Sequence, residues 1–295
     1  MAITASMVKD LRARTGAGMM ECKKALTESG GDIEAAVEAL RKSGAAKADK
    51  RAGRIAAEGT IAACVSDDGT RGVVVEVNCE TDFVAKDDSF KAFAQAVTET
   101  VAQEHPDSVD ALRALPLRGG TGTVEEARQA LIGKIGEKID VRRFSSLEAG
   151  AQGRISAYLH GARIGVLVAV TGGGDGLGKD IAMHIAASRP LCVSKDQVPE
   201  QTVAKEREIY AAQAEGSGKP AQIMEKMVEG RIKKYLGEIT LLGQPFVKDP
   251  DTSVEKLLKD ERAEVGGFIR YEVGEGLERR EDDFVAEVMA QAKGG

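Results

Sequence analysis

The strongest constraint on the fold is a pattern of two apolar runs around a turn, followed by an amphipathic helix, because this pattern occurs twice. The first pair of runs covers 61–65 and 72–78, and the Asp-Gly in the intervening Asp67–Thr70 is typical of a hairpin turn. The second pair covers Ile155–Leu159 and Ile164–Val170. The repetition predicts an α+β fold whose core consists of two related subdomains, each an antiparallel sheet with a helix.

Each hairpin is followed by apolar residues at helical spacing and by a later strand. The first helix carries a stripe that runs from Phe90 to Val101, and the second carries one that runs from Leu177 to Ile185. A further helix is expected over 124–136, and the late strands over 138–144 and 267–273. The two halves therefore share one order of elements.

The remaining segments read as helices outside this core. Thr4 and Asp32 are expected to cap the first and third of three short N-terminal helices. The predicted boundaries are 1–44 for this three-helix domain, 45–57 for a basic linker, 58–148 and 149–280 for the two core subdomains, about 199–242 for an antiparallel helical hairpin inserted in the second, and 281–295 for a C-terminal helical module.

Charge and cysteine content exclude several functional classes. Forty-one Lys and Arg against 47 Asp and Glu give a net charge of −6, which argues against a general nucleic-acid binder. The local basic stretch from Lys47 to Arg54 leaves an RNA-binding arm open as an alternative to a solvated linker. Four dispersed cysteines without a CxxC pair indicate reduced thiols in the cytoplasm and neither a disulfide framework nor a zinc site.

Neither a signal peptide nor a membrane span is expected. The N-terminus lacks a continuous apolar segment, and Ile164–Val170, the longest apolar run, is far too short to cross a bilayer.

One glycine-rich loop resembles a nucleotide-binding motif. Gly173–Lys179 has GxxxxGK spacing and lies between an expected strand and an expected helix. However, Asp180 replaces the Ser or Thr that binds magnesium, and Asp175 would add negative charge to the phosphate cradle. A P-loop-like nucleotide-binding enzyme that uses Gly173–Lys179 is therefore the alternative function, and a plain strand–helix connection is the simpler interpretation.

Two other segments have both a structural and a functional interpretation. Phe83 precedes the first core helix in a chain with only seven Phe, four Tyr and no Trp. It either packs inward beside a cap at Thr81 or is presented on the surface next to Asp82. Met19 and Met20 begin a helix and either fill the N-terminal core or form an adaptable exposed contact.

Four motifs, in order along nearly the whole chain, resemble the elongation factor Ts family of bacterial translation. They are Arg14–Leu26 (RTGAGMMECKKAL), Thr81–Asp87 (TDFVAKD), His160–Val168 (HGARIGVLV) and Asp180–Ala187 (DIAMHIAA). The resemblance implies a ubiquitin-associated-like N-terminal domain and a guanine-nucleotide exchange factor for the GTPase elongation factor Tu. It implies displacement of magnesium from that partner and release of GDP, so that GTP can bind.

The same resemblance assigns roles to particular residues. The stretch that dislodges the partner's magnesium matches Thr81, Asp82, Phe83 and Val84, and the contact near the partner's phosphate loop matches Leu159, His160 and Gly161. Docking is assigned to Leu11, Met19, Met20, Phe284, Val288 and Met289. We therefore expect no catalytic residues, no metal and no cofactor. We also expect a cytoplasmic factor that acts by protein–protein binding without direct nucleic-acid or membrane contact, in a simple or a doubled complex.

Overall fold

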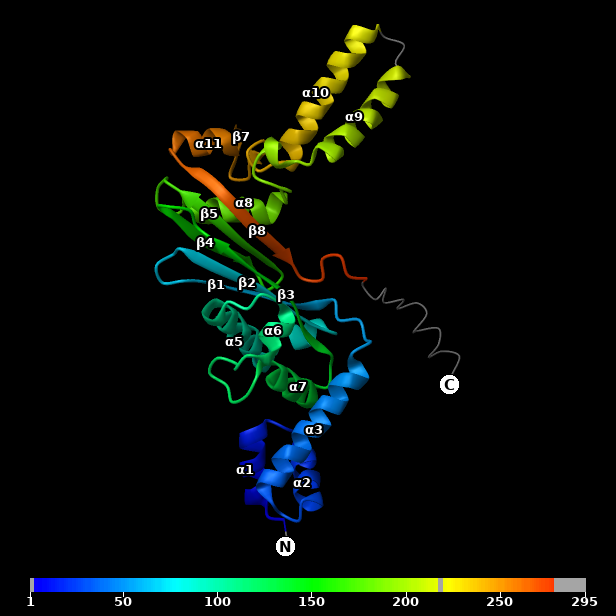
Figure 1. Cartoon of the computed structure of the whole chain (residues 1–295), viewed down its shortest axis with the longest axis vertical. Helices are drawn as coiled ribbons and strands as arrows, with labels where there is room; N and C mark the ends of the chain where they lie inside the picture. The colour runs from blue at the N-terminus through cyan, green and yellow to red at the C-terminus, as the bar shows by residue number, and fades with distance from the viewer. Residues whose placement is uncertain (1–2, 217–219, 279–295) are drawn as a thin grey trace. The chain divides into compact units, whose positions relative to one another are not determined.

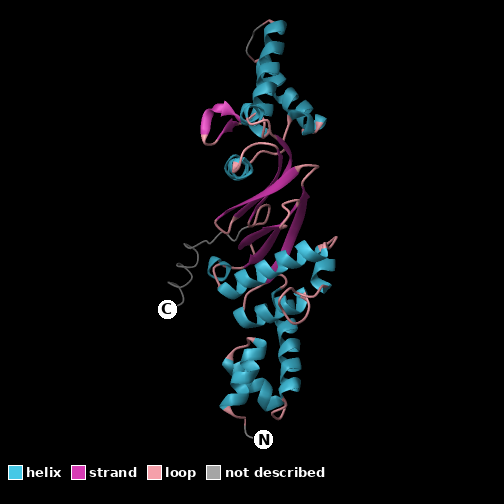
Figure 2. Ribbon diagram, turned by 90° about the vertical axis from the view of Figure 1, so that its left-hand side faces the viewer, coloured by secondary structure: helices cyan, strands magenta, loops and turns pink. Residues whose placement is uncertain are grey.

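The computed structural model describes residues 3–216 and 220–278 (Figure 1). Its elements are α1 Ala5–Thr15, α2 Met19–Glu28, α3 Ile33–Arg51, β1 Glu58–Val65, β2 Arg71–Cys79, α4 Asp82–Ala85, α5 Asp88–Glu104, α6 Val109–Ala114, α7 Val124–Ile135, β3 Ile139–Glu148, β4 Gly153–His160, β5 Ile164–Thr171, α8 Leu177–Ser188, α9 Glu200–Glu215, α10 Ala221–Ile239, β6 Pro245–Phe246, β7 Asp249–Ser253, α11 Val254–Asp260 and β8 Glu264–Glu272. The fold is mixed α and β with small antiparallel sheets, and the strands, magenta in Figure 2, begin only after α3. The predicted 281–295 module lies outside the described residues.

Three helices form the N-terminal part, as the sequence predicts. The Thr4 hydroxyl accepts a hydrogen bond from the Met7 amide at 3.3 Å, and the Asp32 carboxylate accepts one from Ala35 at 3.0 Å, so both expected caps are confirmed. The small core of the three helices is centred on Leu11, Cys22, Ala25, Leu26 and Ala36.

The third helix is longer than predicted. It continues to Arg51 through most of the stretch that was expected to be a linker. Gly44 explains the continuation, because a Cβ there would lie 3.2 Å from the Gln129 carbonyl oxygen, and Gly133 lies directly opposite. Without side chains at the crossing, α3 and α7 approach closely and pack along their length. This packing replaces the expected linker with a helix that, from Gly44 onward, is buried only at Gly44 and Ala48.

The chain forms two compact units. The first contains residues 1–60, 76–143 and the described residues from Glu272, and the second contains 61–75 and 144–271. The three-stranded sheets have the orders β1-β2-β3 and β4-β5-β8, each a predicted hairpin with a later strand beside its second strand. The division into units is not contiguous in sequence, so the predicted subdomain boundaries stay a prediction.

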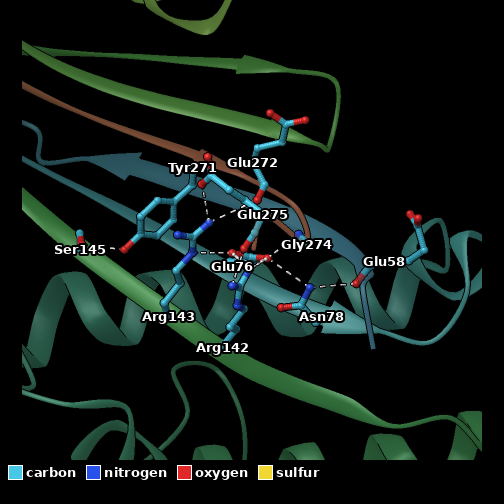
Figure 3. Close-up of polar contacts among 10 residues, drawn as sticks. All are labelled: Glu58, Glu76, Asn78, Arg142, Arg143, Ser145, Tyr271, Glu272, Gly274 and Glu275. Carbon is cyan, nitrogen blue, oxygen red and sulfur yellow. Dashed lines mark hydrogen bonds and ion pairs between the residues drawn. The ribbon is translucent and has the colours of Figure 1, made fainter. Parts of the chain in front are cut away.

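A buried carboxylate holds the end of β8 in the first unit (Figure 3). The Glu76 side chain is fully buried and accepts hydrogen bonds from Arg142 at 3.0 Å, Arg143 at 2.6 Å and the Gly274 amide at 2.8 Å. Two arginines and a backbone amide compensate the cost of burying this charge. Glu76 therefore ties β2, β3 and the segment after β8 together.

The second unit is built on β4, β5 and α8. β4 pairs with β5 from Gly153↔Thr171 to His160↔Ile164, and α8 packs on both strands through Ile181, Ala182 and Ile185. The predicted helical hairpin is present as α9 and α10, the yellow-green and yellow pair in Figure 1. The Ser253 hydroxyl caps α11 by accepting a hydrogen bond from the Lys256 amide at 3.2 Å.

Candidate functional site

The connection from β2 to α5 contains the one-turn helix α4. The Thr81 hydroxyl caps α4 by accepting a hydrogen bond from the Val84 amide at 3.3 Å, and Asp87 caps the start of α5. Val84 and Ala85 are buried, whereas Phe83 is 80% exposed. The inward interpretation of Phe83 is therefore wrong, and α4 presents the phenyl ring to solvent. At this exposure the ring can be reached by another molecule, while the two buried residues after it fix the short helix to the unit.

Two reciprocal carboxylate contacts hold this connection. Glu137, just after α7, accepts hydrogen bonds from the amides of Glu80 and Thr81 and, at 2.7 Å, from the Thr81 hydroxyl. In return, Glu80 accepts one from the Lys138 amide at 2.6 Å and pairs with Arg54 at 3.2 Å. The residues before α4 are thereby joined to those after α7.

Two groups near Phe83 have shifted pKa values, the Asp82 carboxylate and the Cys79 thiol. The exposed Asp82 carboxylate pairs with Lys86 at 2.7 Å, and the hydrogen bond from Lys86 lowers the pKa of Asp82. Burial, together with the Glu137 and Glu58 carboxylates, raises the pKa of the Cys79 thiol to about 12. Cys79 therefore stays a neutral thiol at physiological pH, which is not the state of a nucleophile.

The second predicted contact lies at the β4–β5 turn of the second unit. Leu159 is 42% exposed, and His160 and Gly161 are exposed as well. The Tyr158 hydroxyl lies 3.0 Å from Nδ1 of His160 and orients the ring. Gly161 has φ +59°, a conformation that suits glycine in a tight turn. The turn thus presents one apolar and one polar side chain together.

The N-terminal docking residues divide into two groups. Met19 and Met20, at the start of α2, are 60% and 73% exposed, so the core interpretation of these two residues is wrong. Leu11, in contrast, is fully buried among α1, α2 and α3, and its assignment to a docking surface is corrected to the core. Met7 and Val8, four and three residues earlier on the same face of α1, pack against this core as well. Phe284, Val288 and Met289 lie outside the described residues.

The glycine-rich loop does not have the features of a phosphate cradle. The Gly174 amide already donates a long hydrogen bond of 3.4 Å to the Glu261 carboxylate, and Asp180 pairs with Lys248 at 2.6 Å. Gly172 is needed for packing, since a Cβ there would lie 2.3 Å from the Arg262 carbonyl oxygen. One amide of the loop is thus bonded to a carboxylate, and a second carboxylate lies at the start of α8.

The basic stretch is also largely used within the chain. Lys47 pairs with Glu21, and Arg54 pairs with Glu80. Both of these basic side chains are therefore paired with carboxylates of the chain itself, which weakens the case for an RNA-binding arm.

In residues 3–216 and 220–278, no three His, Cys, Asp or Glu side chains gather as a metal site. Within the same ranges, no helix is both long enough and apolar enough to cross a bilayer.

The contact of Glu137 with Thr81 was not predicted from the sequence. Glu137 lies 56 residues from Thr81 in the chain, and its local sequence is that of an ordinary helix end with Gly136 as the cap. No spacing rule connects two loops so far apart, so only the folded chain identifies it.

Comparisons with known proteins identify the family of the chain. The family model described as Elongation factor TS matches residues 80–275. The chain is 64% identical over 294 residues to the elongation factor Ts of Thioalkalivibrio sulfidiphilus (strain HL-EbGR7), with 100% of both chains covered. It is 61% identical to that of Methylococcus capsulatus and 54% identical to that of Legionella pneumophila (strain Paris), with 99% of each chain covered in both cases. The chain therefore belongs to the elongation factor Ts family of bacterial translation elongation factors.

Proposed function

We propose that this protein is a guanine-nucleotide exchange factor for elongation factor Tu in the bacterial cytoplasm. It acts by protein–protein binding and not as an enzyme with its own covalent chemistry. A factor that binds the nucleotide-free GTPase more tightly than the GDP form weakens GDP binding by the same factor. A factor that bound both forms equally would release nothing.

The observation that carries this proposal is the exposed Phe83 ring on its anchored helix. Phe83 is 80% exposed while its neighbour Val84 is buried, so the ring is available to a partner and the backbone beneath it is fixed. We assign the ring to wedging apart apolar packing near the partner's magnesium, with Asp82 adding polar contacts. Loss of the cation removes positive charge that holds the diphosphate.

Two other surfaces complete the assignment. Leu159, His160 and Gly161 contact the region near the partner's phosphate loop, and their exposure at one turn supports this role. Met19 and Met20 dock the N-terminal helices, because two adjacent flexible thioethers adapt to an apolar surface. The same proposal includes two features of architecture, a ubiquitin-associated-like N-terminal domain and two duplicated core subdomains. It also includes docking by the 281–295 module and a doubled complex.

The first test measures release of a fluorescent GDP analogue from elongation factor Tu by stopped flow. Phe83→Ala, alone and with Asp82→Ala, should lower the rate constant on the order of tenfold, as expected for a buried aromatic anchor at an interface. Val247→Ala is the matched control, because Val247 is another exposed apolar side chain at 45%. Release as fast as with the unmodified protein would exclude the wedge.

The second test separates docking from exchange. Met19→Asp with Met20→Asp should weaken complex formation, because two carboxylates replace the apolar docking contact. The rate of GDP release at saturating factor should change less, because the Phe83 contact is left intact. The affinity is measured by titration calorimetry with nucleotide-free elongation factor Tu. Affinity equal to that of the unmodified protein would remove both methionines from the docking surface.

A further inference from the structure

We propose that Glu137 is a positioning residue for exchange, which fixes the backbone that aims Phe83 at the partner. This inference rests on the proposed function and adds a residue whose hydrogen bonds go to the backbone and hydroxyl before α4.

Both carboxylate oxygens of Glu137 accept hydrogen bonds. One oxygen accepts from the amides of Glu80 and Thr81 at 3.2 and 3.0 Å, and the other accepts from the Thr81 hydroxyl at 2.7 Å. Because the hydroxyl proton is directed to Glu137, the Thr81 oxygen turns a lone pair toward the Val84 amide that it caps. Glu137 thus determines how α4 is capped.

The helix that carries the Phe83 ring would not be stable in isolation. α4 has four residues, and an isolated single turn is unstable because fixing its dihedral angles gains too few hydrogen bonds. Phe83 gains little packing of its own at 80% exposure, so its direction depends on the backbone beneath it. Holding that backbone before binding removes an ordering cost from the complex.

The opposite end of the contact is rigid. Glu137 follows α7, which packs tightly on α3 at the Gly44 crossing, and the Lys138 amide donates to Glu80 at 2.6 Å. Two backbone segments therefore lock each other through two carboxylates, and both belong to the first unit.

The test is a double-mutant cycle with Glu137→Gln, Phe83→Ala and the pair. An amide at 137 has one acceptor oxygen and no charge, so it cannot accept both from the 80–81 amides and from the Thr81 hydroxyl, and the hydroxyl is no longer directed as in the unmodified protein. Glu137→Gln should lower kcat/KM for release of the GDP analogue about tenfold, as expected when hydrogen bonds to a charged group are lost. In the Phe83→Ala background it should cause no further loss, because Glu137 acts through the ring.

The control is Glu99→Gln in the same unit, since Glu99 also accepts a side-chain hydrogen bond and pairs with Arg118. It should keep the unmodified rate. Effects of Glu137→Gln and Phe83→Ala that multiply would overturn the proposal, because Glu137 would then act elsewhere. If Phe83→Ala itself has no effect, the wedge fails and the proposed function with it; if only Glu137→Gln has none, positioning alone fails.

A second readout does not depend on activity. The Cys79 thiol lies beneath the same connection and donates to the Thr81 carbonyl at 3.2 Å, so it reports whether the connection stays closed. Peptide-resolved alkylation at about pH 8 should be several-fold faster at Cys79 in Glu137→Gln and unchanged in Glu99→Gln. Equal protection of Cys79 in all three proteins would show that Glu137 does not hold the connection, and would overturn the proposal.

Discussion

Two strand-to-helix connections, one in each unit, are held in place by different kinds of contact. Between β2 and α5, side-chain carboxylates hold the backbone and Phe83 faces solvent. Between β5 and α8, glycines let the backbone approach other backbone, with Gly172 at φ +74° next to the Arg262 carbonyl. The first connection has a rigid base and an exposed ring, and the second has neither.

The proposed binding role belongs to the first connection, whereas close packing explains the second. At 80% exposure the Phe83 ring adds little to the stability of the free protein, so the ring can serve binding at little cost to folding. Glycines in close backbone contact are explained by sterics alone. The glycine-rich sequence, which looks more like a known motif, is therefore the weaker functional candidate.

Gly172→Ala should break the packing junction. A Cβ at this position meets the Arg262 carbonyl oxygen at 2.3 Å and stands at a positive φ, so we expect a loss of about 3 kcal/mol in the free energy of unfolding. Gly174→Ala is the control, because its nearest neighbour, a Glu261 oxygen, lies 3.6 Å away. Urea unfolding measures both, and equal stability of the two variants would contradict the packing explanation.

Phe83→Ala and Val84→Ala should separate binding from stability within one turn of helix. Val84 is 8% exposed, and removing its two methyl groups should cost about 2 kcal/mol of unfolding free energy. Phe83→Ala should change it by less than about 0.5 kcal/mol. Thermal and urea unfolding test this contrast, and a Phe83 variant as destabilised as the Val84 variant would place the ring in the core.

The helices that follow the two connections should differ in their response to acid. In α8, His184 is buried, its Nδ1 accepts from the Val247 amide at 3.1 Å, and its Nε2 lies 2.9 Å from Gln244. Burial lowers the pKa of His184 below its ordinary 6.5. The unfolded chain therefore takes up this proton first, so the stabilisation is complete above pH 6.5 and is lost as the pH falls below it.

In α5 the buried Thr98 hydroxyl donates to the Ala94 carbonyl at 2.8 Å and does not titrate. Urea unfolding of the second unit near α8, followed by hydrogen exchange, should therefore show a loss between about pH 7.5 and about pH 5.5 that shrinks in His184→Gln. A loss of the same size in the variant would assign the acid response to another group.

Lys179→Ala should have the smallest effect. With carboxylates of Glu261 and Asp180 beside the loop, we expect the protein alone to show no magnesium-dependent binding of ATP or GTP, and the variant to behave identically. Equilibrium dialysis with labelled nucleotide measures this. Binding that requires Lys179 would restore the nucleotide-binding alternative.

Much of the fold is predictable because its signals are local. The two hairpins, the caps at Thr4 and Asp32, the end of α5 at His105 and the end of α7 at Gly136 depend on residues within a few positions of one another. The extension of α3 to Arg51 was missed, because it depends on Gly44 meeting α7 more than 80 residues later in the chain.

The amino-acid order by itself determined the periodic apolar patterns, the turns and the caps, and its motifs indicated the family. Only the tertiary structure decided that Phe83, Met19 and Met20 face solvent, that Leu11 does not, and that Glu137 supports the exposed ring. Exposure is settled by what packs on a side chain from distant parts of the chain. A helical or extended pattern records which side is apolar, but not which of its members a neighbour will cover.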